Sequence, residues 1–269
     1  MQQQTDNFPP ISRPEQSWSH DLRALFQNLY PYGLPLGGNG PRLTLPDSGL
    51  TPKLSSGYAV LGDQLIGPIG QVAIGAAPTS STKNLYYGLK GFGYYADEPE
   101  EPTDFRLGVV STDVDGITFV AQQLVYTSGR FGVWGRVDLT RLAASADVNI
   151  FTAITKASPI GTKAYPYFPE IYPNLPTPDN VGFDKFIVDY AYVKTITALS
   201  AAGTNEVLLK GGDATLVTHD DNSSETQDAV TIAAIDTLVD ADEFVVAINN
   251  SVQPASAGEI EFFVSLIGV

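Results

Sequence analysis

The chain has 269 residues, of which 43% are hydrophobic and only 17% charged, and its formal net charge is −15. This composition excludes an intrinsically disordered chain, and the acidic balance argues against direct binding to nucleic acid or to an anionic membrane, because both are bound through clustered Lys and Arg. The chain contains no Cys, which excludes disulfides, thiolate metal sites and cysteine nucleophiles.

Residues 1–45 predict an N-terminal arm that contains one short helix. Residues 1–16 are polar and carry three prolines, so we expect them to be extended. Apolar residues with the i, i+3, i+4, i+7 spacing of a helix follow, up to Pro31: Leu22, Leu25, Phe26 and Leu29. Residues 30–52 are too rich in Gly and Pro for regular structure, and long loops of this kind usually pack on a neighbouring surface. Together these features indicate a tether for assembly.

Residues 46–160 alternate between apolar and polar positions, which predicts a first β-domain. The clearest strand is residues 130–139, where Val133 and Val137 face one way and Trp134 faces the other. Asp115 and its neighbouring glycine fit the corner of a hairpin turn. Further strands are expected at residues 104–112, 116–126 and 147–155, with glycine-interrupted candidates at 70–77 and 83–95.

Residues 161–180 are expected to form either a linker or an aromatic contact loop. The segment is rich in proline, which disfavours helix and central strand. Four aromatic residues stand among these prolines: Tyr165, Tyr167, Phe168 and Tyr172. Because amphipathic aromatic side chains are favoured where protein surfaces meet, the second alternative would place them at an interface.

Residues 181–269 predict a second β-domain, an antiparallel sandwich or jelly roll of five or six strands separated by turn signals. The last strand is apolar on both faces, with Phe263 and Ile267 on the second face. A two-sided apolar strand at a sheet edge risks aggregation, so either an internal position or a partner subunit must protect it, and we favour a subunit interface. The pattern leaves open whether the two β-domains are separate barrels or one continuous sandwich.

The residues that could carry chemistry form no recognisable catalytic centre. His20 and His219 are the two histidines, and neither accompanies a G-x-S-x-G or H-E-x-x-H motif. His219 stands beside two aspartates, but an ordinary surface histidine is favoured over a metal ligand. The acidic clusters at 97–104 and 220–228 lack the spacing of an EF-hand, so polar loop tips are favoured over calcium sites. We therefore predict no enzyme, no metal site and no cofactor.

Residues 181–269 resemble the ending of β-sandwich proteins from tailed-phage virions. The resemblance is carried by the segment DTLVDADEFVVAINNSVQPASAGEIEFFVSLIGV, in which a closing apolar strand follows a turn of small residues. It implies a structural component of a particle, such as a capsid cement or decoration protein, a head-fibre base or a tail subunit. Such proteins often have jelly-roll folds and are often trimeric. The resemblance implies no catalytic residues.

The leading interpretation is a virion structural protein that contacts its own copies, with a trimer as one candidate, and other virion proteins. We expect no direct contact with nucleic acid or membrane. Synthesis in the host cytoplasm is expected, because the N-terminal residues lack the features of a signal peptide. The residues proposed for subunit contacts are Leu22, Leu25, Phe26, Leu29, Tyr165, Tyr167, Phe168, Tyr172, Phe263 and Ile267.

Two alternatives remain from the sequence. A carbohydrate-binding receptor-recognition module of a virion would stack sugars on Trp134 and on the tyrosines of residues 165–172. A hydrolase would need a pair of carboxylates placed across a sugar, and no spacing in the sequence singles out such a pair.

Overall fold

The protein consists of β-sheets, as predicted, and the described part of the chain contains a single short 3₁₀ helix, η3 (Leu139–Arg141). We describe a computed structural model, which covers residues 34–35, 40–61, 64–66, 74–88, 91–95, 105–127, 130–154, 186–198, 204–222, 230–239, 243–252 and 257–268. The predicted helix, most of the predicted arm (residues 1–33 and 36–39 of residues 1–45) and the Pro/Tyr-rich segment 161–180 lie outside the described residues. So do eight of the proposed contact residues, Leu22, Leu25, Phe26, Leu29, Tyr165, Tyr167, Phe168 and Tyr172.

The larger sheet has nine strands in the order β15-β12-β17-β10-β9-β8-β6-β7, with β1 paired to β9. The β1–β9 pair is parallel and the other pairs are antiparallel. Its strands are β1 (Leu34–Pro35), β6 (Thr82–Gly88), β7 (Gly91–Tyr95), β8 (Phe105–Thr112), β9 (Ile117–Thr127), β10 (Arg130–Asp138), β12 (Phe186–Thr197), β15 (Val230–Val239) and β17 (Glu259–Gly268).

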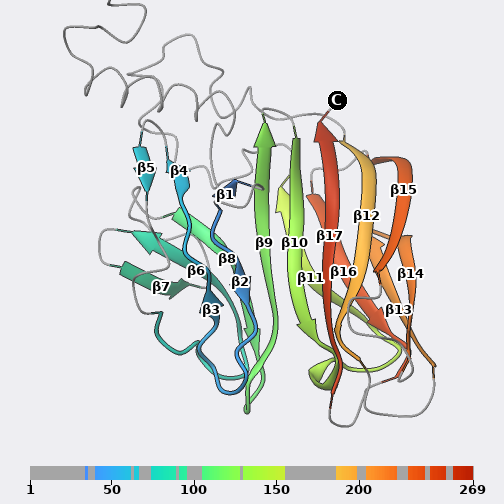
Figure 1. Cartoon of the computed structure of the whole chain (residues 1–269), viewed down its shortest axis with the longest axis horizontal. Helices are drawn as coiled ribbons and strands as arrows, with labels where there is room; N and C mark the ends of the chain where they lie inside the picture. Colours follow the sequence, from blue (N-terminus) through green and yellow to red (C-terminus); the bar gives the residue numbers. More distant parts are fainter. Residues whose placement is uncertain are drawn as a thin grey trace, which may run out of the picture.

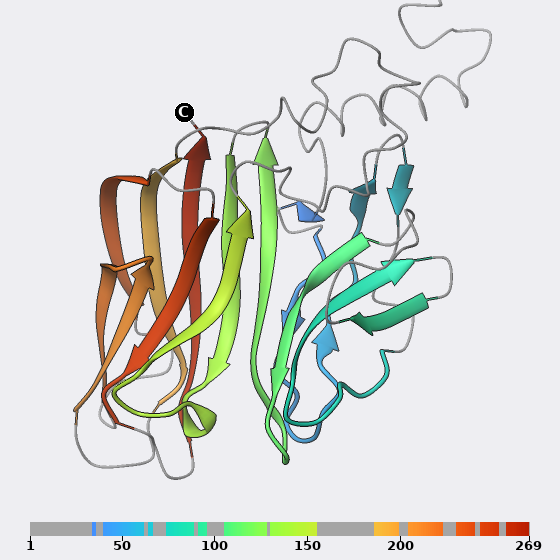
Figure 2. The same cartoon turned by 180° about the vertical axis from the view of Figure 1, so that it is seen from behind.

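A four-stranded antiparallel sheet with the order β11-β16-β13-β14 packs against part of the larger one. It lies behind β10, β17 and β12 in Figure 1 and in front of them in Figure 2. These two layers form the predicted β-sandwich. The strands of the smaller sheets are β11 (Asp147–Ile154), β13 (Thr204–Gly211), β14 (Ala214–Asn222) and β16 (Glu243–Asn250), together with the pairs β2 (Leu43–Thr44) with β3 (Lys53–Leu54) and β4 (Ala59–Leu61) with β5 (Gln64–Ile66).

Strands from both predicted β-domains lie side by side in the larger sheet. β10 pairs with β9 on one side and with β17 on the other, so Trp134 stands opposite Phe263. β17 is therefore an internal strand, between β10 and β12. Of the two alternatives for this strand, the structure shows the internal position and not the favoured edge at a subunit interface. The sequence pattern could not decide this, because the pairing of β10 with β17 joins segments more than a hundred residues apart. The domain division at residues 161–180 stays a prediction.

Local turn chemistry explains the hairpin that joins β8 to β9. Asp113 Oδ1 accepts hydrogen bonds from the backbone N–H groups of Asp115 at 2.7 Å and Gly116 at 2.8 Å, and the Asp113 N–H donates to the Gly116 carbonyl at 3.0 Å. This is the predicted hairpin turn. The glycine-interrupted candidate 83–95 is a second hairpin, β6–β7. In the candidate strand 70–77, the described residues 74–77 are not in a strand.

The larger sheet buries apolar side chains on both faces. On the face toward the four-stranded sheet lies the inner core, which includes Val133, Val137, Val193, Phe262 and Val264 from the larger sheet and Phe151, Val207, Leu209, Val246 and Ile248 from the smaller one. On the opposite face lies the outer core, which includes Leu43, Leu85, Leu107, Val120, Leu124, Trp134 and Phe263. Alternate side chains of β10 and β17 thus belong to two different cores, one on each face of the sheet.

Candidate functional site

The outer face of β10, β17 and β12 carries a row of aromatic side chains. Strand register places Trp134, Phe263 and Tyr192 next to one another across the three strands. The ring of Phe263 lies 5.5 Å from that of Tyr190 and 5.7 Å from that of Tyr192, centroid to centroid. In Figure 1 no described strand lies in front of β17 and β12. We call Trp134, Tyr190, Tyr192 and Phe263 the aromatic face.

A glycine makes this packing possible. A Cβ atom on Gly132 would lie 2.3 Å from a ring carbon of Phe263, far inside van der Waals contact. The ring therefore rests on the bare backbone of β10, which is a known use of glycine within a sheet.

The four aromatic residues differ in exposure. Trp134 is 7% exposed and Phe263 only 2%, whereas Tyr190 and Tyr192 are half-buried. The tyrosine rings therefore form the accessible part of the aromatic face. Phe263, a proposed contact residue, is covered within its own chain. The other proposed residue of this strand, Ile267, is half-buried and stands opposite Ile187 on the same face.

The burial of Trp134 contradicts its expected role as a sugar-stacking platform. Stacking requires a ring face that a sugar can reach, and this ring packs in the outer core. The tyrosines of residues 165–172, the other part of that hypothesis, lie outside the described residues.

A charged row borders the aromatic face along the same strands. Arg136 donates to Glu261 Oε2 through Nε at 3.1 Å and Nη2 at 3.0 Å, and to Glu259 Oε1 through Nη1 at 3.2 Å. The Tyr192 hydroxyl donates to Glu261 Oε1 at 3.0 Å. Burial, reinforced by the Glu261 carboxylate, raises the pKa of Tyr192. Burial also raises the pKa of Glu259, and Arg136 offsets this only in part.

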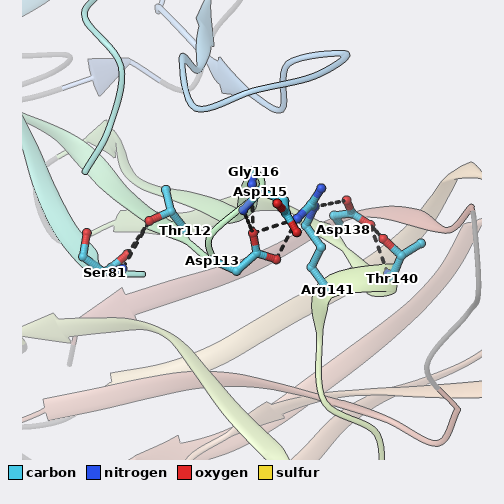
Figure 3. Close-up of polar contacts among 8 residues, drawn as sticks. All are labelled: Ser81, Thr112, Asp113, Asp115, Gly116, Asp138, Thr140 and Arg141. Carbon is cyan, nitrogen blue, oxygen red and sulfur yellow. Dashed lines mark hydrogen bonds and ion pairs between the residues drawn. The ribbon is translucent and has the colours of Figure 1, made fainter. Parts of the chain in front are cut away.

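A polar groove of about 400 Å³ opens where the charged row ends. Its walls come from residues 44–49, from the end of β10, from the start of β17 and from η3. Figure 3 shows the ion pairs beside it, in which Arg141 joins two aspartates. Arg141 Nη1 lies 2.7 Å from Asp113 Oδ2, and its Nε lies 3.2 Å from Asp138 Oδ2. The Thr140 hydroxyl donates to Asp138 at 2.6 Å.

Asp113 both closes the hairpin turn and holds Arg141. Burial favours its neutral form, but the hydrogen bonds from Arg141 and from the backbone N–H groups of Asp115 and Gly116 outweigh burial and lower its pKa. Across the strands, Asp138 stands directly opposite Glu259, a like-charge pair. In the part of the chain that the structure describes, no group of three or more His, Asp or Glu side chains is placed to hold a metal ion.

His219 is buried, so its assignment as a surface histidine was wrong. Its Nε2 lies 2.8 Å from the Thr195 hydroxyl and its Nδ1 lies 2.8 Å from the Thr231 hydroxyl. It links β14 of the four-stranded sheet to β12 and β15 of the larger one. Both ring nitrogens are occupied by hydroxyl groups, and the neighbouring Asp220 is exposed, so the geometry is that of an internal polar bridge between the two layers.

The sequence reasoning missed Gln122, which anchors the start of β2. Its side chain is fully buried. Its Oε1 accepts from the Leu43 N–H at 2.8 Å, and its Nε2 donates to the Leu107 carbonyl at 3.0 Å and the Pro41 carbonyl at 3.4 Å. The available signal was its position two residues from both Val120 and Leu124, on the apolar face of a strand.

Comparisons with known proteins add no family. No family model matches the chain, and no curated protein matches it. Among solved structures, one match is a chain in the structure of the infectious bursal disease virus Gt strain. The two chains are 12% identical, with a TM-score of 0.22, over 88% of this chain and 70% of that chain. The Gx strain of the same virus gives 10% identity and a TM-score of 0.21, over 88% and 69%. TM-scores this low do not establish a shared fold. Among the described residues, no helix is long and apolar enough to cross a membrane.

Proposed function

We propose that this protein is a structural component of a virus particle, a capsid cement or decoration protein or another head or tail component, which stabilises the particle through subunit contacts. The observation that carries the proposal is the aromatic face. One sheet buries apolar side chains on both faces, and on the second face the accessible layer is made of half-buried tyrosines. Amphipathic aromatic residues are enriched in protein interfaces.

The surroundings of the aromatic face support a contact role. Tyr190 and Tyr192 are half-buried, with Ile187 and Ile267 at one end of the face and the charged row of Arg136 at the other. An apolar centre with a polar margin is the usual anatomy of a protein interface. The contact that fits this face is therefore with another folded protein, and a homo-oligomer, with a trimer as one candidate, is the simplest form.

The resemblance of residues 181–269 to the ending of tailed-phage β-sandwich proteins supports the step from a contact protein to a virion component. The net charge of −15 fits partners other than the nucleic acid, because phosphates are bound through clustered cations. In this proposal the protein performs no catalysis, and its partners are its own copies and other virion proteins.

Changing the aromatic face tests the proposal. In the full chain, Tyr190→Glu would place a charge in the centre of the interface, and we expect it to shift the oligomer to monomers in light scattering, because burying an unpaired charge is costly. The matched control is Val114→Glu, which places the same charge on a 69% exposed side chain at the β8–β9 turn. A chain that is monomeric before any substitution, or that never co-purifies with particles from its host, would refute the proposal.

A further inference from the structure

Two asparagines at one end of the four-stranded sheet are buried with polar atoms left over. Asn205 is 1% exposed and Asn250 is 0% exposed. Within the described part of the chain, no group hydrogen-bonds to Oδ1 or Nδ2 of Asn250 or to Nδ2 of Asn205. Unpartnered buried polar groups strongly destabilise a fold and are rare in native proteins. These three atoms therefore call for an occupant that pairs with them.

Strand register places the two asparagines near each other on one face of the sheet. Asn250 on β16 stands opposite Val207 on β13, and Asn205 precedes Val207 by two residues. Side chains two residues apart lie on the same face of a strand, so both asparagines face the same side as Val207, which belongs to the inner core. They are diagonal neighbours, a spacing of about 7–8 Å between their backbones, which suits a small bridging molecule.

The two hydrogen bonds that Asn205 Oδ1 accepts fix the orientation of the Asn205 side-chain amide. Oδ1 accepts from the Ser251 hydroxyl at 3.0 Å and from the Val252 N–H at 3.1 Å. Turning the amide over would bring its NH₂ group against the Val252 N–H, so Nδ2 is directed elsewhere. For Asn250 the orientation of the amide does not matter, because in either orientation both its NH₂ group and its carbonyl oxygen still need partners.

The chemistry of these atoms selects the occupant. Both asparagines offer N–H donors, and Asn250 also offers an acceptor. A metal ion would pair only with the carbonyl oxygen, and an anion only with the N–H groups. Water donates and accepts, and buried waters typically make about three hydrogen bonds to otherwise unsatisfied groups. We infer that this place is an internal hydration site, in which a bound water molecule donates to Asn250 Oδ1 and accepts from the Nδ2 groups of Asn205 and Asn250.

The position gives the bound water a structural role. It joins the start of β13 to the end of β16. The backbone carbonyl of Asn250 accepts from the Ser145 N–H at 2.7 Å, so the same asparagine also holds the turn that follows η3. The water thus links two neighbouring strands of the four-stranded sheet, independently of any contact between subunits.

Nuclear magnetic resonance of the ¹⁵N-labelled full chain tests this inference. We expect the side-chain NH₂ groups of Asn205 and Asn250 to show magnetisation transfer from a water molecule that stays bound far longer than surface water. In Asn250→Leu this transfer should be lost at Asn205 as well. The matched control is Asn249→Leu, one position along the strand, where the side chain donates to Asp147 and the transfer at Asn205 should persist.

Two results would overturn the inference. One is the absence of water contact at both NH₂ groups in the unmodified protein, a measurement that stands even if Asn250→Leu fails to fold. The other is displacement of the signals by added Ca²⁺, which would identify a cation site instead. Neither result depends on the oligomeric state, so failure here is distinct from failure of the proposed virion role.

Discussion

The inner and outer cores lie on opposite faces of the same strands, but different groups cover their buried side chains. On the inner face, Phe262 and Val264 are fully buried against a second sheet. On the outer face of the same strand, Phe263 is covered by the rings of two tyrosines that remain half-buried. The inner face is packed against a second sheet, whereas on the outer face of β12 the tyrosine rings stay half-buried and the Tyr192 hydroxyl keeps a polar contact with Glu261. The two faces of one strand thus differ in how far their side chains are closed off from solvent.

The largest expected effect is on the inner face. Phe262→Ala should lower the free energy of unfolding by about 3–5 kcal/mol, because it removes a large side chain that is closed in on all sides. Urea denaturation measures this. Tyr190→Ala, a truncation on the outer face, should cost clearly less. Equal losses for the two variants would break the comparison between the cores.

Gln122→Leu tests how the outer core holds the start of β2. It should cost about 1–3 kcal/mol, because the Leu43 N–H and the Leu107 carbonyl lose their buried partner. Hydrogen exchange should speed up at the Leu43 N–H first. The control is the adjacent Gln123→Leu. If Gln122→Leu leaves exchange at Leu43 unchanged, the anchoring role is wrong.

Gly132→Ala should destabilise the aromatic face by about 1–2 kcal/mol, because the new methyl group displaces the Phe263 ring. Combining it with Phe263→Leu should recover part of the loss, since the smaller side chain makes room, and a double-mutant cycle measures the coupling. Strictly additive effects would show that the glycine and the ring are not in contact.

The smallest effect concerns the groove. The folded-state pKa of Asp113 is lowered, so its contribution to stability is present above the ordinary carboxyl pKa and is lost as the pH falls through the lowered value. Asp113→Asn should therefore cost below about 1 kcal/mol near neutral pH, given partial exposure, and should flatten the acid side of the stability profile. Acid titration of unfolding checks this. A profile unchanged from the unmodified chain would contradict it.

Local chemistry determined much of this fold in advance. Period-two alternation in residues 130–139 predicted β10 and sorted Val133 and Trp134 onto opposite faces, and the Asp-Gly corner predicted the β8–β9 hairpin. Such features depend on the neighbours of each residue along the chain, and a backbone turn or a strand alternation has the same form whatever lies beside it.

The tertiary structure alone decided which strands became neighbours. Alternation says that β17 has two apolar faces, but not that β10 and β12 flank it, because any apolar strand satisfies the same pattern. Non-local pairing also placed His219 between two threonines, buried Trp134 and set Asn205 diagonal to Asn250. Burial and hydrogen-bond partnership depend on contacts between segments far apart in the chain, and those contacts are properties of the folded sheet order.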